Sequence, residues 1–368
     1  MTVGFHSPLP PAPTGVADYS AALLTALQKL GRVEANAAKA DTHLYHVGNN
    51  HLHRDIYTRA LREPGVTVLH DAVLHHFFLG SSAEQQYVDE FVYNYGSWYT
   101  DLARSLWKTR ARSATDPRYF EYPMLKRIAE RSRAVIVHNP AAAKIVKAHA
   151  PEATVLEIPH LFVPPDLPPL YEVERLRAKL GLKPSTFLFG VFGHLRESKR
   201  LLPILRAFET VQRSTGAMLL ITGDFASTDL ARALKPLLQG PGIIRIGYLP
   251  DTAFWLHASA IDACINLRYP AAGETSGIAM RFMGIGKPLI LSDGLEVSRI
   301  PDAACVRVDT GPTEEPMLAA AMQWLATSPS DAREIGARAS RQIAEQHAID
   351  AVAAAYWRVL TSCYDGSH

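Results

Sequence analysis

Apolar residues recur along the first half of the chain in two alternating patterns. Short runs rich in Val, Ile and Leu are typical of buried strands, and longer stretches with apolar positions three or four residues apart are typical of helices. We expect strands at 3–6, 43–47, 66–69 and 134–138, and helices at 16–30, 54–61, 82–107 and from Pro140 onward.

The second half alternates in the same way. We expect strands at 187–192, 218–222, 243–246, 263–267 and 289–291, helices at 201–213, 230–238, 252–259 and 276–286, and a helical tail over 331–363. Strands that alternate with helices predict parallel sheets covered by helices on both faces. Ligands on such sheets bind beyond the carboxyl ends of the strands.

A proline cluster separates the two halves. Proline lacks a backbone N–H and has a fixed φ, so this stretch is neither a helix nor a central strand. We interpret it as an interdomain linker, and a long surface loop within one domain is the alternative. The chain of 368 residues suits two domains at roughly 100–200 residues each, and we place them at 1–163 and 164–348. The prolines concerned are Pro159, Pro164, Pro165, Pro168 and Pro169.

Composition and charge exclude several classes of protein. Lys plus Arg number 38 and Asp plus Glu 36, so the net charge of +2 gives no basic field for nucleic acid. Cys264, Cys305 and Cys363 are far apart, which argues against a disulfide framework or zinc ribbon and favours a reducing, cytoplasmic setting. We expect neither a signal peptide nor a membrane span, which leaves peripheral contact with the inner membrane face open.

Two candidate ligand segments follow strands of the first half. The loop 7–16 contains Gly15, which lets a ligand approach the backbone closely, and the helix that follows favours negative charge. His70 follows the strand 66–69 and could hydrogen-bond a sugar hydroxyl, with Asp71 orienting it or capping the next helix. The structural alternatives are a rigid loop and a satisfied histidine beside a cap.

A third segment, 193–200, follows the strand 187–192. It contains Arg196, Lys199 and Arg200, and three cations at the carboxyl end of a strand suit a diphosphate. The alternative is a solvated basic helix start. Cations at a helix N-terminus oppose the helix dipole, which argues against that alternative.

A fourth segment, 270–280, precedes an apolar helix. Thr275, Ser276 and Gly277 would present backbone N–H groups at the start of that helix, which is an anion site. Glu274 lies just before them, and a carboxylate beside a phosphate is electrostatically unfavourable unless it binds hydroxyls or stabilises positive charge. A sugar next to the phosphate would supply both the hydroxyls and the positive charge. The alternative is an ordinary capped helix.

Histidines and aromatic residues crowd the first half. His51, His53, His75 and His76 suggest a metal, but no carboxylate spacing completes a set of ligands, so we expect no metal site. We interpret some of these histidines as lining a ligand site, where imidazoles can bind hydroxyls or acidic groups. Aromatic residues recur at helical spacing over 87–107, and we interpret them as facing the hydrophobic core. The alternative is that they stack on a sugar or a lipid.

These segments together resemble the retaining glycosyltransferases of family 4. The stretches concerned are S-P-L-P-P-A-P-T-G, L-H-D, F-G-H-L-R-E-S-K and G-E-T-S-G-I-A-M-R-F-M-G-I-G-K-P. The resemblance implies an α/β chain with the GT-B fold, in which two Rossmann-like doubly wound domains face each other across a cleft. It also implies that the donor binds mainly to the C-terminal domain and the acceptor to the N-terminal one, without a metal ion. The C-terminal helix 349–368 would pack back on the first domain.

The resemblance carries over residue by residue. Lys199 matches the family lysine on the donor diphosphate, and Glu274 matches the first glutamate of the E-x7-E motif, which faces the donor sugar. The family arginine falls on His194, with Arg196 as its candidate replacement. The second glutamate, which holds the ribose hydroxyls, falls on Phe282 and is missing.

The candidate site is therefore defined by role. We expect the catalytic residues to be His70, Arg196, Lys199 and Glu274. We expect the donor-binding residues to be Gly15, Gly193, His194, Thr275, Ser276 and Gly277. On the acceptor side we expect Thr14, Asp18 and Asp71. No cofactor is expected besides the nucleotide-diphosphate sugar, which is a co-substrate.

The predicted function is retaining transfer of a sugar from that donor to a hydroxyl of a glycan, a lipid-linked sugar or a small molecule, as in polysaccharide biosynthesis. No enzymic nucleophile is evident, so attack would come from the front face through an oxocarbenium-like state. Two alternatives stay open. The missing glutamate and arginine are compatible with a non-catalytic accessory subunit, and a sugar-nucleotide epimerase of related fold would act without an acceptor.

Overall fold

The computed structural model describes residues 1–365, which form two compact units. Of the described residues, the first unit comprises 1–163, 270–275 and 346–365, and the second comprises 164–269 and 276–345. The last three positions of the predicted helix 349–368 lie outside the described residues. Among the residues described, no helix is long and apolar enough to cross a membrane.

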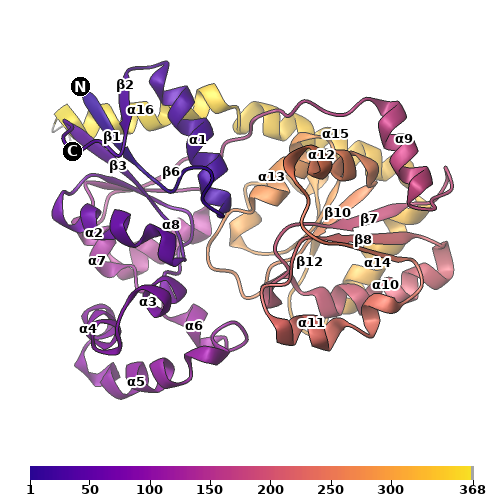
Figure 1. The fold of residues 1–368 in the computed structure, drawn as a ribbon, viewed down its shortest axis with the longest axis horizontal. Helices are drawn as coiled ribbons and strands as arrows, with labels where there is room; N and C mark the ends of the chain where they lie inside the picture. The colour runs from indigo at the N-terminus through magenta and orange to yellow at the C-terminus, as the bar shows by residue number, and fades with distance from the viewer. Residues whose placement is uncertain (366–368) are drawn as a thin grey trace. The chain divides into compact units, whose positions relative to one another are not determined.

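The first unit is built on a six-stranded parallel sheet with the order β2-β1-β3-β4-β5-β6 (Figure 1). The strands are β1 (Thr2–His6), β2 (Arg32–Ala35), β3 (Thr42–Val47), β4 (Val66–Leu69), β5 (Ala134–Val137) and β6 (Val155–Glu157). The helices are α1 (Gly15–Gln28), α2 (Arg54–Arg62), α3 (His75–Ser81), α4 (Glu84–Tyr95), α5 (Thr100–Lys108), α6 (Arg118–Glu121), α7 (Lys126–Arg131), α8 (Pro140–His149) and α16 (Ile349–Asp365).

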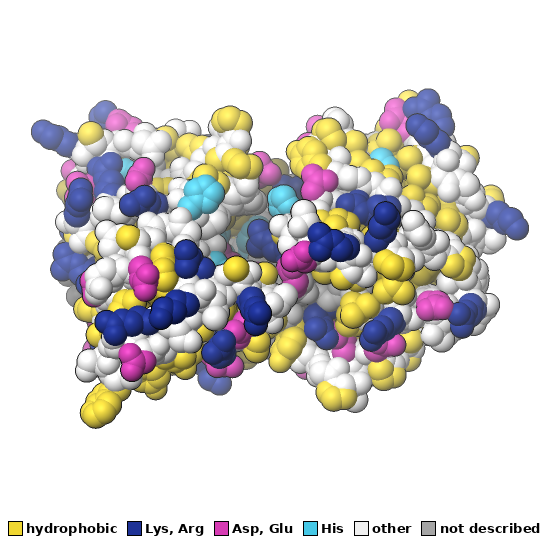
Figure 2. Space-filling view, turned by 60° about the horizontal axis from the view of Figure 1, so that its bottom comes forward, with side chains coloured by type: hydrophobic (Ala, Val, Ile, Leu, Met, Phe, Trp, Pro, Cys, Tyr) yellow, Lys and Arg dark blue, Asp and Glu magenta, His cyan; other side chains and the backbone are white. Residues whose placement is uncertain are grey.

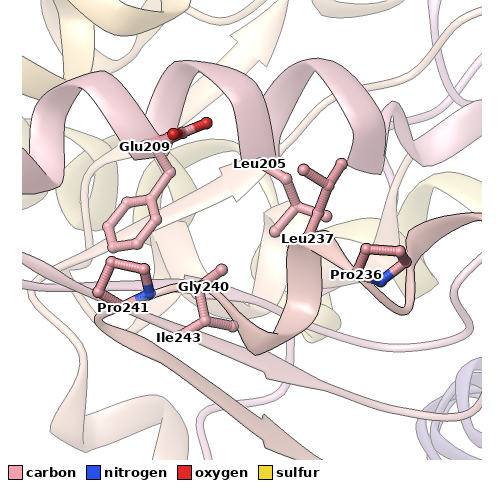
Figure 3. Close-up of a pocket in the computed structure, with 8 residues that line it drawn as sticks. Leu205, Glu209, Pro236, Leu237, Gly240, Pro241 and Ile243 are labelled. Carbon is pink, nitrogen blue, oxygen red and sulfur yellow. The ribbon is translucent and has the colours of Figure 1, made fainter.

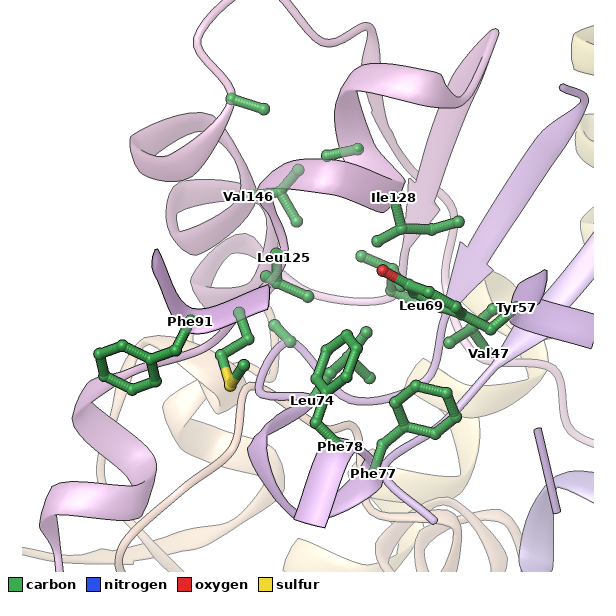
Figure 4. Close-up of a cluster of buried hydrophobic side chains, with 14 of the residues drawn as sticks. Val47, Tyr57, Leu69, Leu74, Phe77, Phe78, Phe91, Leu125, Ile128 and Val146 are labelled. Atoms are coloured by element: carbon green, nitrogen blue, oxygen red, sulfur yellow. The ribbon is translucent and has the colours of Figure 1, made fainter. Parts of the chain in front are cut away.

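Successive strand residues of this sheet point into two different cores, because side chains alternate between faces. Leu44 and Val68 pack in one core with α1 and α16. Val47 and Leu69 pack in the other, where Figure 4 shows them beside Tyr57 of α2 and residues of α3 and α7. The final helix of the chain therefore covers one face of the first sheet.

The second unit is built on another parallel sheet, with the order β12-β11-β10-β7-β8-β9. Its strands are β7 (Leu188–Val191), β8 (Met218–Thr222), β9 (Ile243–Ile246), β10 (Ala263–Asn266), β11 (Leu289–Ser292) and β12 (Val306–Val308). Its helices are α9 (Leu170–Lys179), α10 (Leu201–Thr215), α11 (Thr228–Leu234), α12 (Asp251–Ala260), α13 (Gly277–Gly284), α14 (Glu314–Thr327) and α15 (Pro329–Gln346). The predicted α/β class with two doubly wound parallel sheets is confirmed.

Two predicted helices are interrupted. The helix expected over 82–107 is α4 and α5, separated at Gly96, whose φ of +94° is outside the range of a right-handed helix. The helical tail breaks between α15 and α16, where the backbone carbonyl of His347 accepts a hydrogen bond from Phe162 N at 2.8 Å. Strands β2, β6 and β12 and helices α3, α6, α7, α9 and α14 were not predicted.

Each sheet has one point where the strand order reverses direction. This switch lies between β1 and β3 in the first sheet and between β7 and β10 in the second. Loops that leave the carboxyl ends of the two strands at such a point diverge and leave a crevice, which is where doubly wound sheets bind ligands. The loops 7–14, 193–199 and 267–276 all leave these strands.

Candidate functional site

The loop after β7 brings a buried lysine beside the first turn of α13. Gly193 has a φ of +83°, and a Cβ built on it would lie 3.4 Å from Lys199 Nζ and 3.5 Å from Ile278 Cγ1. The Lys199 side chain is only 5% exposed, and its ammonium group donates a hydrogen bond to the carbonyl oxygen of Phe192. At the switch point of the second sheet, Gly193 therefore has both the Lys199 ammonium group and the side chain of Ile278, in the first turn of α13, as close neighbours.

The surroundings of Lys199 favour an anion. Burial lowers the pKa of Lys199 well below its ordinary value, and repulsion from Arg268 and Arg196 lowers it further, while Cys264 raises it. Burial likewise raises the pKa of the Cys264 thiol to about 12, so this neighbour is neutral at pH 7. A phosphate bound at the loop would offset both the desolvation and the repulsion.

The start of α13 is fixed from within the second unit. Ser276 Oγ accepts a hydrogen bond from Ala279 N at 3.3 Å and another from Asn266 Nδ2, at the end of β10, at 2.9 Å. The Ser276 side chain therefore caps the helix. The first-turn N–H groups of an α-helix have no partners within the helix and can bind an anion. The Ser276 side chain is occupied by these contacts, so any anion here would be bound by backbone N–H groups of Ser276 and Gly277.

The other cations of the loop differ in their surroundings. Arg200 has a φ of +58°, and its Nε donates to both carboxylate oxygens of Glu314, at 3.0 and 2.9 Å. Glu314 is 2% exposed, so Arg200 neutralises a buried carboxylate. Arg196 and His194 are exposed, and burial together with the charges of Arg196 and Lys199 lowers the pKa of His194. Of the three cations predicted at this loop, only Arg196 and Lys199 therefore suit a diphosphate.

The segment with Glu274 packs within the first unit, although its neighbours in sequence belong to the second. Ala72 N donates to Ala272 O at 2.7 Å, and Asn139 Nδ2 donates to Gly273 O at 2.9 Å. Glu274 Oε2 accepts from Ala272 N at 2.7 Å. Gly273 has a φ of +69°, and a Cβ there would lie 2.6 Å from Ala72 Cβ. Close packing therefore requires glycine at position 273.

Histidines line the carboxyl edge of the first sheet. His46 Nδ1 and His70 Nε2 lie 3.0 Å apart, and the Tyr19 ring centroid lies 5.0 Å from that of His70 and 4.7 Å from that of His160. Burial is the main reason that the pKa values of His46 and His70 lie well below their usual range. Neutral imidazoles suit hydrogen bonds with hydroxyls. Among residues 1–365, no group of three or more His, Cys, Asp or Glu has metal-binding geometry.

Of the residues predicted on the acceptor side, Thr14 and Asp18 lie at the start of α1, and Asp71 follows β4. Thr14 Oγ1 caps α1 by accepting from Val16 N at 3.4 Å, and Asp18 lies in the first turn of that helix. Asp71 Oδ2 accepts from Asn49 N at 2.8 Å, which ties it to the loop after β3. A Cβ on Gly15 would meet no atom of the described residues within 4 Å, so the space beside Gly15 is open.

Phe282, at the position of the missing glutamate, is a core residue. It is fully buried, and its ring centroid lies 4.7 Å from that of Phe192. The adjacent Arg281 is partly exposed, with its guanidinium group 5.4 Å from the Phe254 ring centroid and 5.7 Å from that of Trp255. A glutamate at position 282 would therefore be buried among aromatic rings.

An apolar pocket lies elsewhere in the second unit, between α10 and the start of β9 (Figure 3). It is at the amino end of β9, away from the carboxyl edge, so we do not place the site there. Its lining residues are Leu205, Phe208, Glu209, Pro236, Leu237, Gly240, Pro241 and Ile243. Figure 2 shows Lys and Arg side chains together with Asp and Glu side chains over the visible face.

Known proteins were compared with this chain in sequence and in structure. No known family and no curated protein matches the sequence. Sucrose-phosphate synthase from Thermosynechococcus elongatus matches the structure with a TM-score of 0.69 and 15% identity over 100% of both chains. The Anabaena protein HepE, solved with UDP-glucose, gives a TM-score of 0.66 and 13% identity over 98% of this chain and 100% of HepE. WaaG, a glycosyltransferase involved in lipopolysaccharide biosynthesis, gives 0.64 and 12% over 98% and 99%.

This chain has the GT-B fold. Within that fold, the structure groups the predicted residues into two sets. Gly193, Lys199 and the first turn of α13 lie together in the second unit, whereas His70, Glu274 and Thr275 belong to the first.

Sequence reasoning missed Asn139, Asn266 and Glu314. Asn139 had a visible signal, because it directly follows a strand and precedes Pro140, and asparagine before a first-turn proline is a helix cap at a carboxyl edge. Asn266 and Glu314 had none, because their partners Ser276 and Arg200 are defined only by the fold.

Proposed function

We propose that this protein is a retaining glycosyltransferase, related to family 4, that transfers a sugar from a nucleotide-diphosphate sugar to a hydroxyl acceptor without a metal ion. The observation that supports this most is the buried Lys199 beside the first turn of α13, at the switch point of the second sheet. A cation and backbone N–H groups at one point form a site for a diphosphate. HepE, of the same fold, was solved with UDP and with UDP-glucose.

The proposed chemistry follows from these groups. Lys199, Arg196 and the helix start of α13 stabilise negative charge on the departing diphosphate as the anomeric C–O bond breaks. The acceptor hydroxyl attacks from the same face, and a phosphate oxygen of the donor takes its proton. Glu274 and His70 bind sugar hydroxyls and steady the oxocarbenium-like charge.

The test is a ligand screen followed by an activity assay. Unfolding temperature is measured with UDP-, GDP-, ADP- and dTDP-sugars, because a ligand at 100 times its Kd stabilises a fold by about 2.7 kcal/mol. Any donor that binds is then assayed for slow hydrolysis and for transfer. We expect hydrolysis with retention at the anomeric carbon, lowered about 100-fold or more in Glu274→Gln. An inverted product would contradict the proposal.

A non-catalytic accessory subunit is the second candidate, favoured by the burial of Phe282 where the family has a glutamate. It predicts binding of a nucleotide sugar without turnover. The hydrolysis assay separates the two candidates, because only an enzyme converts the bound donor.

A further inference from the structure

We infer that Asn139 is a positioning residue for Glu274, holding the segment 270–275 so that the carboxylate meets the donor sugar. The inference rests on the proposed function, which gives Glu274 its role. Nothing in the sequence resemblance assigns a role to Asn139. The residue lies at the carboxyl end of β5, and its side chain is 2% exposed.

The amide of Asn139 has two faces with separate partners. Its Oδ1 accepts from Ala142 N at 2.9 Å and so caps α8. Its Nδ2 donates to Gly273 O at 2.9 Å and to Thr275 Oγ1 at 3.0 Å, on either side of Glu274. Because the cap fixes the orientation of the amide, both donor hydrogens point at the segment.

Two further contacts, both with Ala72, hold the segment 270–275 in place. Ala72 N holds Ala272 O at 2.7 Å, and Gly273 packs so closely on Ala72 that a Cβ would lie 2.6 Å from Ala72 Cβ. The backbone on both sides of Glu274 is thus tied to the first unit. A displacement of about 1 Å at a reacting centre can lower a rate about 100-fold. Loss of a hydrogen bond that positions the backbone beside Glu274 is therefore expected to lower the rate.

The two faces of Asn139 can be separated by substitution. Asn139→Asp and Asn139→Ser both keep an oxygen that caps α8, since Asp, Ser and Asn are comparable caps. Neither keeps an N–H donor for Gly273 O. The serine variant adds no charge, so a defect shared by both variants reports the lost donor and not a new carboxylate.

Asn94→Ser is the matched control. Asn94 is also an asparagine that joins two segments of the first unit, since its Nδ2 donates to Glu90 O at 2.8 Å and its Oδ1 accepts from Lys126 N at 2.9 Å. Its partners lie on α4 and at the start of α7, and none of them belongs to the candidate site. A purely structural loss should therefore lower its unfolding midpoint and leave kcat unchanged.

The experiment measures hydrolysis of the donor found in the screen, together with urea unfolding and amide hydrogen exchange. For Asn139→Ser and Asn139→Asp we expect kcat to fall about 10- to 100-fold and KM for the donor to change less than threefold. The unfolding midpoint should fall as it does in Asn94→Ser, since each variant loses hydrogen bonds within the first unit, so the loss of kcat and not the loss of stability distinguishes position 139. Exchange in residues 270–275 should accelerate. In a Glu274→Gln background, Asn139→Ser should have little further effect.

Three results would overturn the inference. They are unchanged kcat in both variants, a loss of kcat that is additive with Glu274→Gln, and equal losses of kcat in Asn94→Ser. If the wild type hydrolyses none of the nucleotide sugars, the proposed function fails and the role of Asn139 toward Glu274 fails with it. If the wild type is active and the Asn139 variants match it, only the inference fails.

Discussion

At the scale of single residues, Lys199 and Arg200 are adjacent cations with different surroundings. Lys199 is 5% exposed, and burial and two neighbouring arginines lower its pKa. A buried charge without an opposite charge costs free energy. Arg200 is adjacent in sequence but instead neutralises the buried Glu314.

Lys199→Met is expected to separate stability from function. Methionine fills a similar volume without a charge, so we expect the free energy of unfolding to rise by about 0.5–2 kcal/mol. Binding of the donor and of UDP should be lost together with transfer. Urea unfolding and a nucleotide titration check the two effects. Lys179→Met, at an exposed position of α9, is the control and should leave both measurements unchanged.

At the scale of elements, the carboxyl edge of the first sheet depends on neutral histidines. His53 is fully buried between β3 and α2, and His138 is 7% exposed at the end of β5. Burial lowers the pKa of each from 6.5 to about 4. His53 Nδ1 donates to His46 O at 2.9 Å, which raises the pKa of His53, so burial of the ring is the cause of the lowered value.

The first unit should therefore lose stability in mild acid. Between pH 6.5 and about 4 the unfolded chain binds protons that the folded chain excludes, so stability is full above pH 6.5 and falls as the pH drops. Each such histidine contributes about 1.4 kcal/mol per pH unit within that window. Hydrogen exchange in β3 and β4 as a function of pH measures the slope.

His53→Asn tests the assignment of that slope. An asparagine can still donate to His46 O but does not titrate. The dependence of the free energy of unfolding on pH should therefore correspond to about one proton fewer than in the wild type. An unchanged slope would mean that His53 does not contribute to acid sensitivity.

At the scale of the whole molecule, the chain begins and ends in the same unit. Helix α16 packs on the first sheet together with α1, and its Tyr356 hydroxyl lies 2.9 Å from that of Tyr19 in a fully buried pair. Val352 and Leu360 of the same helix are also buried. The second unit is therefore an insertion between the sheet of the first unit and the helix that completes it.

Removal of α16 should consequently damage the first unit. A chain that ends at residue 348 exposes the apolar face formed by β1, β3 and β4, so we expect aggregation and dye binding to exposed apolar surface. In the full chain, Tyr356→Ala should lower the free energy of unfolding by about 3–5 kcal/mol. Tyr356→Phe removes only the hydroxyl contact and should cost about 1 kcal/mol. Urea unfolding measures both variants, and equal losses would contradict this role of the ring.

The sequence by itself determined the alternation of strands and helices and the loops where a ligand belongs, because burial periodicity and glycine, proline and capping positions are local properties of the chain. Lys199 and Glu274 were singled out in this way as candidate site residues. Only the tertiary structure decided that Phe282 lies in the hydrophobic core and that Arg200 pairs with Glu314. It also decided that the backbone beside Glu274 is held within the first unit by Asn139. Those outcomes depend on contacts between residues far apart along the chain, which no local pattern encodes.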